Sequence, residues 1–100
     1  IGFAKVTYES SIPDTNMSGM LLNKFYLDPA DTRKGYGQVM FDTVKDLARA
    51  REKDFVWLEV LEQNERACNF YRKQGMTLIK RDYFKTASQQ SVIRIMGIAV

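Results

Sequence analysis

Thr32-Arg33-Lys34-Gly35-Tyr36-Gly37-Gln38 decides how this chain folds, because the stretch joins a predicted strand to a predicted helix. Two glycines at such a junction let the backbone come close to a ligand, and the first amide groups of the helix have no intrahelical partners. These amides and the helix dipole favour an anion, typically a phosphate group, and Arg33 and Lys34 add positive charge. The stretch therefore predicts a site for a phosphorylated cofactor.

The hydrophobic pattern predicts a mixed fold in the element order β-β-α-β-α-β-β. We expect strands over residues 1–8, 18–27, 55–61, 76–80 and 91–100, helices over about 38–53 and 65–74, and loops over 10–16 and 82–90. The first helix places Met40, Val44, Leu47, Ala48 and Arg51 on one mostly apolar face. Asn64 is a suitable N-cap and Gly75 a suitable C′ residue for the second helix. Two strand-helix-strand units imply an α/β (α+β) fold, with helices packed on a mixed, mostly antiparallel sheet.

Composition limits the chain to a single domain over residues 1–100. No apolar run approaches the ~20 residues that span a bilayer, so no membrane partner is expected. The single cysteine, Cys68, excludes an internal disulfide and fits a cytoplasmic setting. The chain has no His, which excludes His-dependent catalysis and, together with the single cysteine, argues against a metal site. The net charge of +3 suits an anionic ligand but is too weak and too scattered to predict nucleic-acid binding.

The glycine pair fits neither common phosphate-binding motif. Gly35-x-Gly37 lacks the third glycine of Gly-x-Gly-x-x-Gly, and no Gly-Lys-Ser/Thr closes a P-loop, which leaves a plain tight turn as one interpretation. The context, from Leu27-Asp28-Pro29 into an amphipathic helix, resembles the acetyl-coenzyme A signature of the GNAT superfamily of N-acetyltransferases, Gln/Arg-x-x-Gly-x-Gly/Ala. Thr32 stands where that pattern has Gln or Arg, and Arg33 follows it directly.

A second motif lies after the next strand, Asn64-x-x-Ala67-x-x-Phe70-Tyr71-x-x-x-Gly75. By itself it describes an N-capped helix with one buried aromatic face. It also resembles the second GNAT signature, Asn-x-x-Ala-x-x-Phe-Tyr-x-x-x-Gly-Phe, with Met76 in place of the last Phe. The two motifs together imply a GNAT-like fold over essentially the whole chain, without the strand, two helices and further strand with which that fold normally begins.

The resemblance implies that acetyl-coenzyme A (acetyl-CoA) is the donor substrate. In that family, backbone amides of the glycine turn hold the pyrophosphate, and the pantetheine arm runs along the preceding strand. The implied cofactor-binding residues are Phe25, Tyr26, Leu27, Thr32, Arg33, Lys34, Gly35, Tyr36, Gly37, Gln38, Asn64 and Lys73, with Arg72 as an alternative to Lys73.

The resemblance also implies a catalytic role for Tyr71. Its phenol would protonate or hydrogen-bond the thiolate that leaves when an amine attacks the thioester. A backbone amide near Leu27 would bind the oxyanion. Because the chain has no His, Glu59 is the candidate base, acting on the amine through water, and Glu62 is a weaker alternative. A structural salt bridge is an equal alternative for Glu59.

These residues predict transfer of acetyl to a primary amine of a small molecule or a peptide, by direct attack. The alternative is a catalytically inactive CoA-binding or dimerisation module of the same fold. Acidic residues that would attract a polyamine are present, but the net charge is positive. The sequence therefore does not predict which amine is the acceptor. Because exposed strand edges invite pairing, we also expect a homodimer through the final strand, over residues 91–100.

Overall fold

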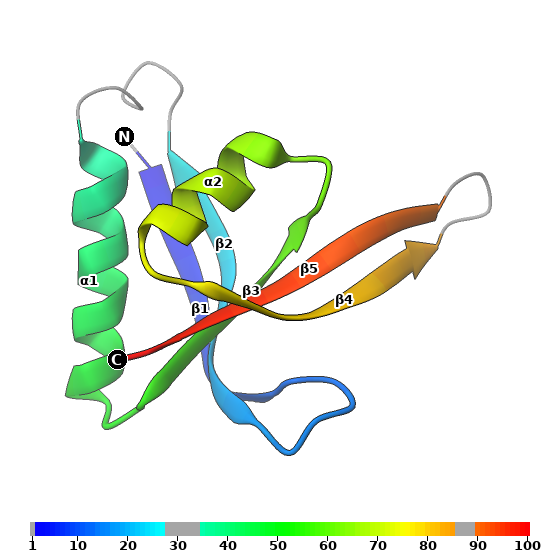
Figure 1. Ribbon diagram of the computed structural model, residues 1–100. Coiled ribbons are helices and arrows are strands. Elements are labelled where there is room, and N and C mark those ends of the chain that lie inside the picture. Colours follow the sequence, from blue (N-terminus) through cyan, green and yellow to red (C-terminus); the bar gives the residue numbers. More distant parts are fainter. Residues whose placement is uncertain (1, 28–34, 86–89) are drawn as a thin grey trace.

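The described part of the chain, residues 2–27, 35–85 and 90–100 of a computed structural model, folds in the predicted element order (Figure 1). The elements are β1 (Gly2–Ser11), β2 (Ser18–Leu27), α1 (Tyr36–Ala50), β3 (Phe55–Leu61), α2 (Glu65–Lys73), β4 (Thr77–Lys85) and β5 (Gln90–Ala99). Asn64 is the N-cap of α2, and Gly75 follows its C-cap with a φ of 98°. Both capping residues of α2 are therefore confirmed.

β1 and β4 are longer than predicted. β1 continues to Ser11 rather than ending near Tyr8, and β4 continues to Lys85 through residues that were predicted as loop. Cross-strand pairing holds both extensions, as at Ser11↔Ser18 and Lys85↔Gln90. A strand that is stabilised by a partner elsewhere in the chain leaves little signal in its own composition.

The buried face of α1 is rotated relative to the prediction. Its buried residues are Gly37, Phe41, Val44 and Ala48. Met40 and Leu47, which were predicted on this face, are only half-buried. Arg51 lies beyond the helix as its C-cap, with its guanidinium 4.5 Å from the centre of the Tyr8 ring. The prediction was therefore right for Val44 and Ala48 and wrong for Arg51, which lies after the end of the helix, while Phe41 takes the fully buried position next to the half-buried Met40.

The strands form one sheet in the order β1-β2-β3-β5-β4. β2 and β3 are parallel, and the other neighbouring strands are antiparallel, which confirms the mixed, mostly antiparallel sheet. β5 pairs with β3 on one side and with β4 on the other. The prediction of a dimer through this strand is therefore wrong about the strand, because both of its edges are occupied. Among the described strands, β1 and β4 are the outer ones.

The two helices cover one face of the sheet. The larger core lies between them and the sheet, with Met20, Phe41, Val56 and Met76 among its fully buried members. A smaller cluster of Ile12, Trp57 and Ile95 lies on the opposite face. There the segment between β1 and β2 folds over the sheet, and the Trp57 Nε1–H donates to the Ser10 carbonyl at 3.2 Å. No helix in the described ranges is long and apolar enough to cross a membrane.

Candidate functional site

β2 and β3 pair only near their starts and then diverge. In these two fully described strands, the paired residues are Met20↔Val56 and Leu21↔Trp57. Figure 1 shows the strands separating toward the end of the sheet at which α1 begins. Gly19 permits the close approach at the paired end, because a Cβ there would lie 2.6 Å from the carbonyl oxygen of Phe55. Beyond this point the inner edge of β2 has no strand partner, which leaves main-chain donors and acceptors for a ligand.

A β-bulge sets the direction of the side chains along this free edge. The register of β2 against β1 shifts by one residue at Asn23, which is therefore the extra residue. The Thr7 hydroxyl donates a hydrogen bond to Asn23 Oδ1 at 2.8 Å. Because one extra residue reverses the alternation of faces, Phe25 packs into the core on the helix side and Tyr26 lies on the opposite face.

Aromatic rings close the opening on the helix side. Phe25 of β2, Phe41 of α1, and Phe70 and Tyr71 of α2 are in mutual contact, with ring centroids 5.6 to 6.3 Å apart. At the other strand, the Cys68 thiol of α2 lies 3.6 Å from the carbonyl oxygen of Leu61. Helix α2 therefore contacts both diverging strands and forms the floor of the opening between them.

Tyr71 combines a buried ring with an accessible hydroxyl group. The residue is only 9% exposed, and burial together with the nearby Cys68 thiol raises the pKa of its phenol above the usual 10.0. The hydroxyl has no hydrogen bond to another described residue. Because no buried side-chain nitrogen or oxygen in the described ranges lacks a partner, that hydroxyl reaches the surface. Tyr71 thus presents a protonated, unengaged donor at the opening.

The N-terminus of α1 is left open to a ligand. Gly35 is the N-cap with a φ of 78°, a left-handed conformation that favours glycine, and no side chain of a described residue caps the helix. Gly37 is buried, Tyr36 is exposed, and the Gln38 amide donates to Asp42 Oδ1 at 3.0 Å, away from the helix amides. Among the described residues, no side chain therefore occupies the first-turn amides, which are suited to an anion. The predicted site residues Thr32, Arg33 and Lys34 lie outside the described residues.

The predicted site residues of α2 lie at its two ends. The Asn64 side-chain oxygen accepts a hydrogen bond from the Ala67 amide at 3.2 Å, which fixes the start of the helix. Its amide group is exposed and can still donate to a ligand. Lys73 and Arg72 are exposed in the last turn, and the Arg72 guanidinium donates to Asn69 Oδ1 at 3.0 Å. A role of these residues toward the cofactor stays a prediction.

The two candidate bases differ sharply in their surroundings. Glu59 alternates along β3 with Leu58 and Val60 of the helix-side core, so it lies on the opposite face, where it is exposed. No described residue forms an ion pair with Glu59, and both its role as base and the salt-bridge alternative stay predictions. Glu62 instead accepts hydrogen bonds from Arg81 at 2.9 and 2.8 Å and from Arg94 at 2.9 Å.

These hydrogen bonds make Glu62 a poorer candidate for the base than Glu59. Hydrogen bonds from Arg81 and Arg94 lower the pKa of the Glu62 carboxyl below its usual 4.5, so the carboxylate is a weaker proton acceptor than a free one. The Glu62 carboxylate instead connects the turn after β3 to strands β4 and β5 through these hydrogen bonds. Sequence reasoning missed this network because its three members are far apart in the chain.

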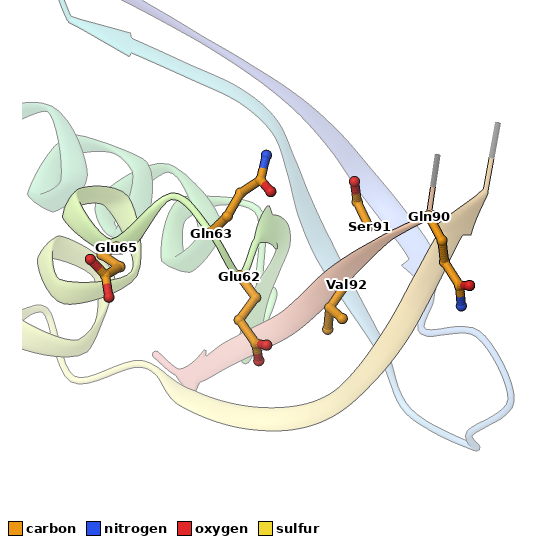
Figure 2. Close-up of a pocket in the computed structure, with 6 residues that line it drawn as sticks. All are labelled: Glu62, Gln63, Glu65, Gln90, Ser91 and Val92. Atoms are coloured by element: carbon orange, nitrogen blue, oxygen red, sulfur yellow. The ribbon is translucent and has the colours of Figure 1, made fainter. Parts of the chain in front are cut away.

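A hollow of about 450 Å³ lies beside this network, between the turn after β3, the start of α2 and the first residues of β5, and Figure 2 shows the residues that line it. It is lined by Glu62, Gln63, Glu65, Gln90, Ser91 and Val92. Apart from Glu62, the weaker candidate for the base, none of these residues was predicted to belong to the site.

The β2 bulge is the other feature that sequence reasoning missed. Its signal was present, because the apolar positions Met20, Leu22 and Phe25 break the strict alternation of a strand. An extra residue between Leu22 and Phe25 restores that alternation, as the structure does at Asn23.

Comparison with known proteins places these features in a family. A family model described as "Acetyltransferase (GNAT) family" matches residues 2–76. An uncharacterized N-acetyltransferase in the pepI 3′ region of Lactobacillus delbrueckii subsp. lactis is 30% identical over 71 residues, which cover 71% of this chain and 41% of that protein. The chain therefore spans less than half the length of this relative.

Solved structures share the fold. The structure of Ard1 from Thermoplasma volcanium matches with a TM-score of 0.82 at 23% identity, covering 100% of this chain and 63% of that one. Nourseothricin acetyltransferase matches with a TM-score of 0.80 at 28% identity, covering 98% of this chain and 56% of that one. Structures of the same fold include complexes with CoA and with acetyl-CoA.

Proposed function

This chain belongs to the acetyltransferase (GNAT) family, and we propose that it transfers the acetyl group of acetyl-CoA to a primary amine of a small molecule or a peptide. The observation that carries the proposal is the opening between β2 and β3. Three features support it: the unpaired edge of β2 beyond Leu21, the N-terminus of α1 with Gly35 as its N-cap, and the Tyr71 hydroxyl, which has no partner among the described residues. An acyl-CoA thioester could use them for its pantetheine arm, its pyrophosphate and its departing sulfur.

Acetyl-CoA would bind along the edge of β2 and at the N-terminus of α1. The amide groups of the pantetheine arm would pair with the free edge of β2 near Phe25–Leu27, as a further strand does. The pyrophosphate would accept hydrogen bonds from the first amides of α1, which Gly35 and Gly37 leave accessible. Thr32, Arg33, Lys34, Asn64 and Lys73 are proposed to add side-chain contacts, in keeping with the family resemblance.

The reaction needs one proton to leave the amine and one to reach the sulfur. The amine nitrogen would attack the thioester carbonyl, forming a C–N bond and an oxyanion that a main-chain amide near Leu27 stabilises. Collapse would break the C–S bond, and the Tyr71 phenol would give its proton to the departing thiolate. Glu59, exposed and without an ion pair among the described residues, would take the proton from the amine through a water molecule.

Calorimetric titration with acetyl-CoA, followed by thiol release over a panel of amines, tests the proposal. Binding with turnover on at least one amine would support it. Binding without release on any amine would instead favour a CoA-binding module without catalysis. The absence of binding would contradict both interpretations.

A further inference from the structure

Two lysines lie next to each other on the face of the sheet opposite the helices. Lys5 and Lys24 are direct partners across β1 and β2, and both are exposed. Like charges placed directly opposite each other destabilise a sheet. Neither lysine forms an ion pair with a described residue. By contrast, the ammonium nitrogen lies 2.6 to 3.5 Å from a carboxylate oxygen in each of Lys45, Lys53 and Lys80.

The β-bulge directs this charge to the acceptor side of the proposed site. Because Phe25 packs into the helix-side core, its neighbours Lys24 and Tyr26 lie on the opposite face, which is also the face of Glu59. The two lysines and Glu59 therefore flank the same opening, the lysines from the β2 side and Glu59 from the β3 side. The Thr7–Asn23 hydrogen bond holds the bulge that sets this direction.

An apolar platform adjoins the lysine pair. Phe3 and Tyr26, the next cross-strand pair on the same face, contact each other with ring centroids 5.6 Å apart. They are 54% and 48% exposed. The rings offer contact area to the carbon skeleton of a ligand whose charged group reaches the lysines.

We propose that Lys5 and Lys24 bind a negatively charged group on the acceptor, so that the substrate is an amine that also carries a carboxylate or a phosphate. This inference rests on the proposed function and specifies its acceptor. The amine would lie toward Glu59, the anionic group would lie between the two ammonium groups, and the intervening carbons would contact Phe3 and Tyr26. A polyamine would meet like charge on the β2 side of the opening and would be a poor substrate.

Matched amines test the inference on the full chain. Thiol release is measured for β-alanine against propylamine and for phosphoethanolamine against ethanolamine, with spermidine as a cationic acceptor. We expect kcat/KM to be about fivefold to tenfold higher for the anionic member of each pair at low salt, and this preference to shrink as salt is added. The two pairs distinguish a carboxylate site from a phosphate site.

Substitution of the two lysines provides the decisive comparison. The Lys5→Gln/Lys24→Gln variant should lose about fivefold to tenfold in kcat/KM for the anionic amine, through KM, while kcat/KM for the neutral amine and the Kd for acetyl-CoA stay unchanged. Lys53→Gln/Lys80→Gln, in which the two lysines are paired with Glu9 and Asp14, is the control with the same change of charge. The Tm of the double variant should not fall, since the substitution removes a like-charge contact.

Direct binding separates this inference from the proposed function. Calorimetry with the anionic amine in the presence of CoA should show binding that the double variant weakens. If neutral and anionic amines react equally well, or the double variant retains the anionic preference, the inference is wrong although the acetyltransferase proposal stands. If no amine reacts but binding of the anionic amine depends on the lysines, the function is wrong and the anion site stands. If neither turnover nor lysine-dependent binding is seen, both are wrong.

Discussion

Replacing Tyr71 by Phe removes one oxygen atom and separates the chemical role of this residue from its structural role. The ring packs against Phe25, Phe41 and Phe70, and a phenylalanine ring would keep these contacts. The hydroxyl has no hydrogen bond to a described residue, so its removal leaves no described partner unsatisfied. We therefore expect the free energy of unfolding to change by no more than about 0.5 kcal/mol.

The effect on turnover should be much larger. Proton transfer by a positioned side chain contributes about 10²- to 10⁴-fold, so Tyr71→Phe should lower kcat by at least about 100-fold if the phenol protonates the thiolate. The Kd for acetyl-CoA should stay within about twofold, because the lost proton is needed only when the C–S bond breaks. Tyr71→Ala, by contrast, should also cost about 3–5 kcal/mol of stability through the cavity it leaves in the aromatic cluster.

The assay compares both variants with Tyr83→Phe, a change of the same atoms at an exposed tyrosine. Thiol release gives kcat, calorimetry gives the Kd for acetyl-CoA, and urea denaturation gives stability. Because the pKa of Tyr71 is raised above 10.0, kcat should not decline through loss of the phenol proton below that pH. A Tyr71→Phe variant that keeps half of its turnover, or loses its affinity for acetyl-CoA, would refute the reasoning.

Three further substitutions test other parts of the structure. Gly19→Ala should destabilise the fold by about 1–3 kcal/mol in urea denaturation, since its Cβ would meet a β3 carbonyl oxygen at 2.6 Å; unchanged stability would contradict that close approach. Gly35→Ala should cost about 1–2 kcal/mol through the φ of 78°, and should weaken acetyl-CoA binding in calorimetry; equal affinity would argue against the α1 site. Glu62→Gln should lower the urea midpoint at neutral pH, and the difference should vanish in acid. The reason is that Arg81 and Arg94 lower the folded-state pKa of Glu62, so their stabilisation is present above pH 4.5 and is lost as the pH falls through that lowered pKa; a difference independent of pH would contradict the pairing.

The features that could be predicted from the sequence are those with local causes. Asn64 caps α2 and Gly75 follows its end because short-range hydrogen bonding and backbone conformation decide both positions. The strand-to-helix junction before α1 is likewise set by the glycines and by the periodicity that follows. Most of the element order could therefore be predicted from local causes, and the fold class could be predicted from the element order.

The features that could not be predicted depend on distant partners. The outer half of β4 is a strand because β5 pairs with it, and the position of β5 inside the sheet is a property of the whole topology. The Arg81–Glu62–Arg94 network likewise joins residues far apart in the chain. Cofactor binding by Phe25 and Tyr26 stays a prediction, and the bulge that sends their side chains to opposite faces could not be predicted without the register with β1.

The interior position of β5 has a consequence for how the molecule comes to be folded. β3 and β4 are synthesised first, yet they become joined only through β5, which pairs with both. Until residues 90–99 are available, the nascent chain holds β1, β2 and β3 on one side and an isolated β4 on the other, and the hairpin that closes the sheet cannot form. The complete sheet therefore forms only after β5 has been synthesised, because its contacts join segments that leave the ribosome at different times.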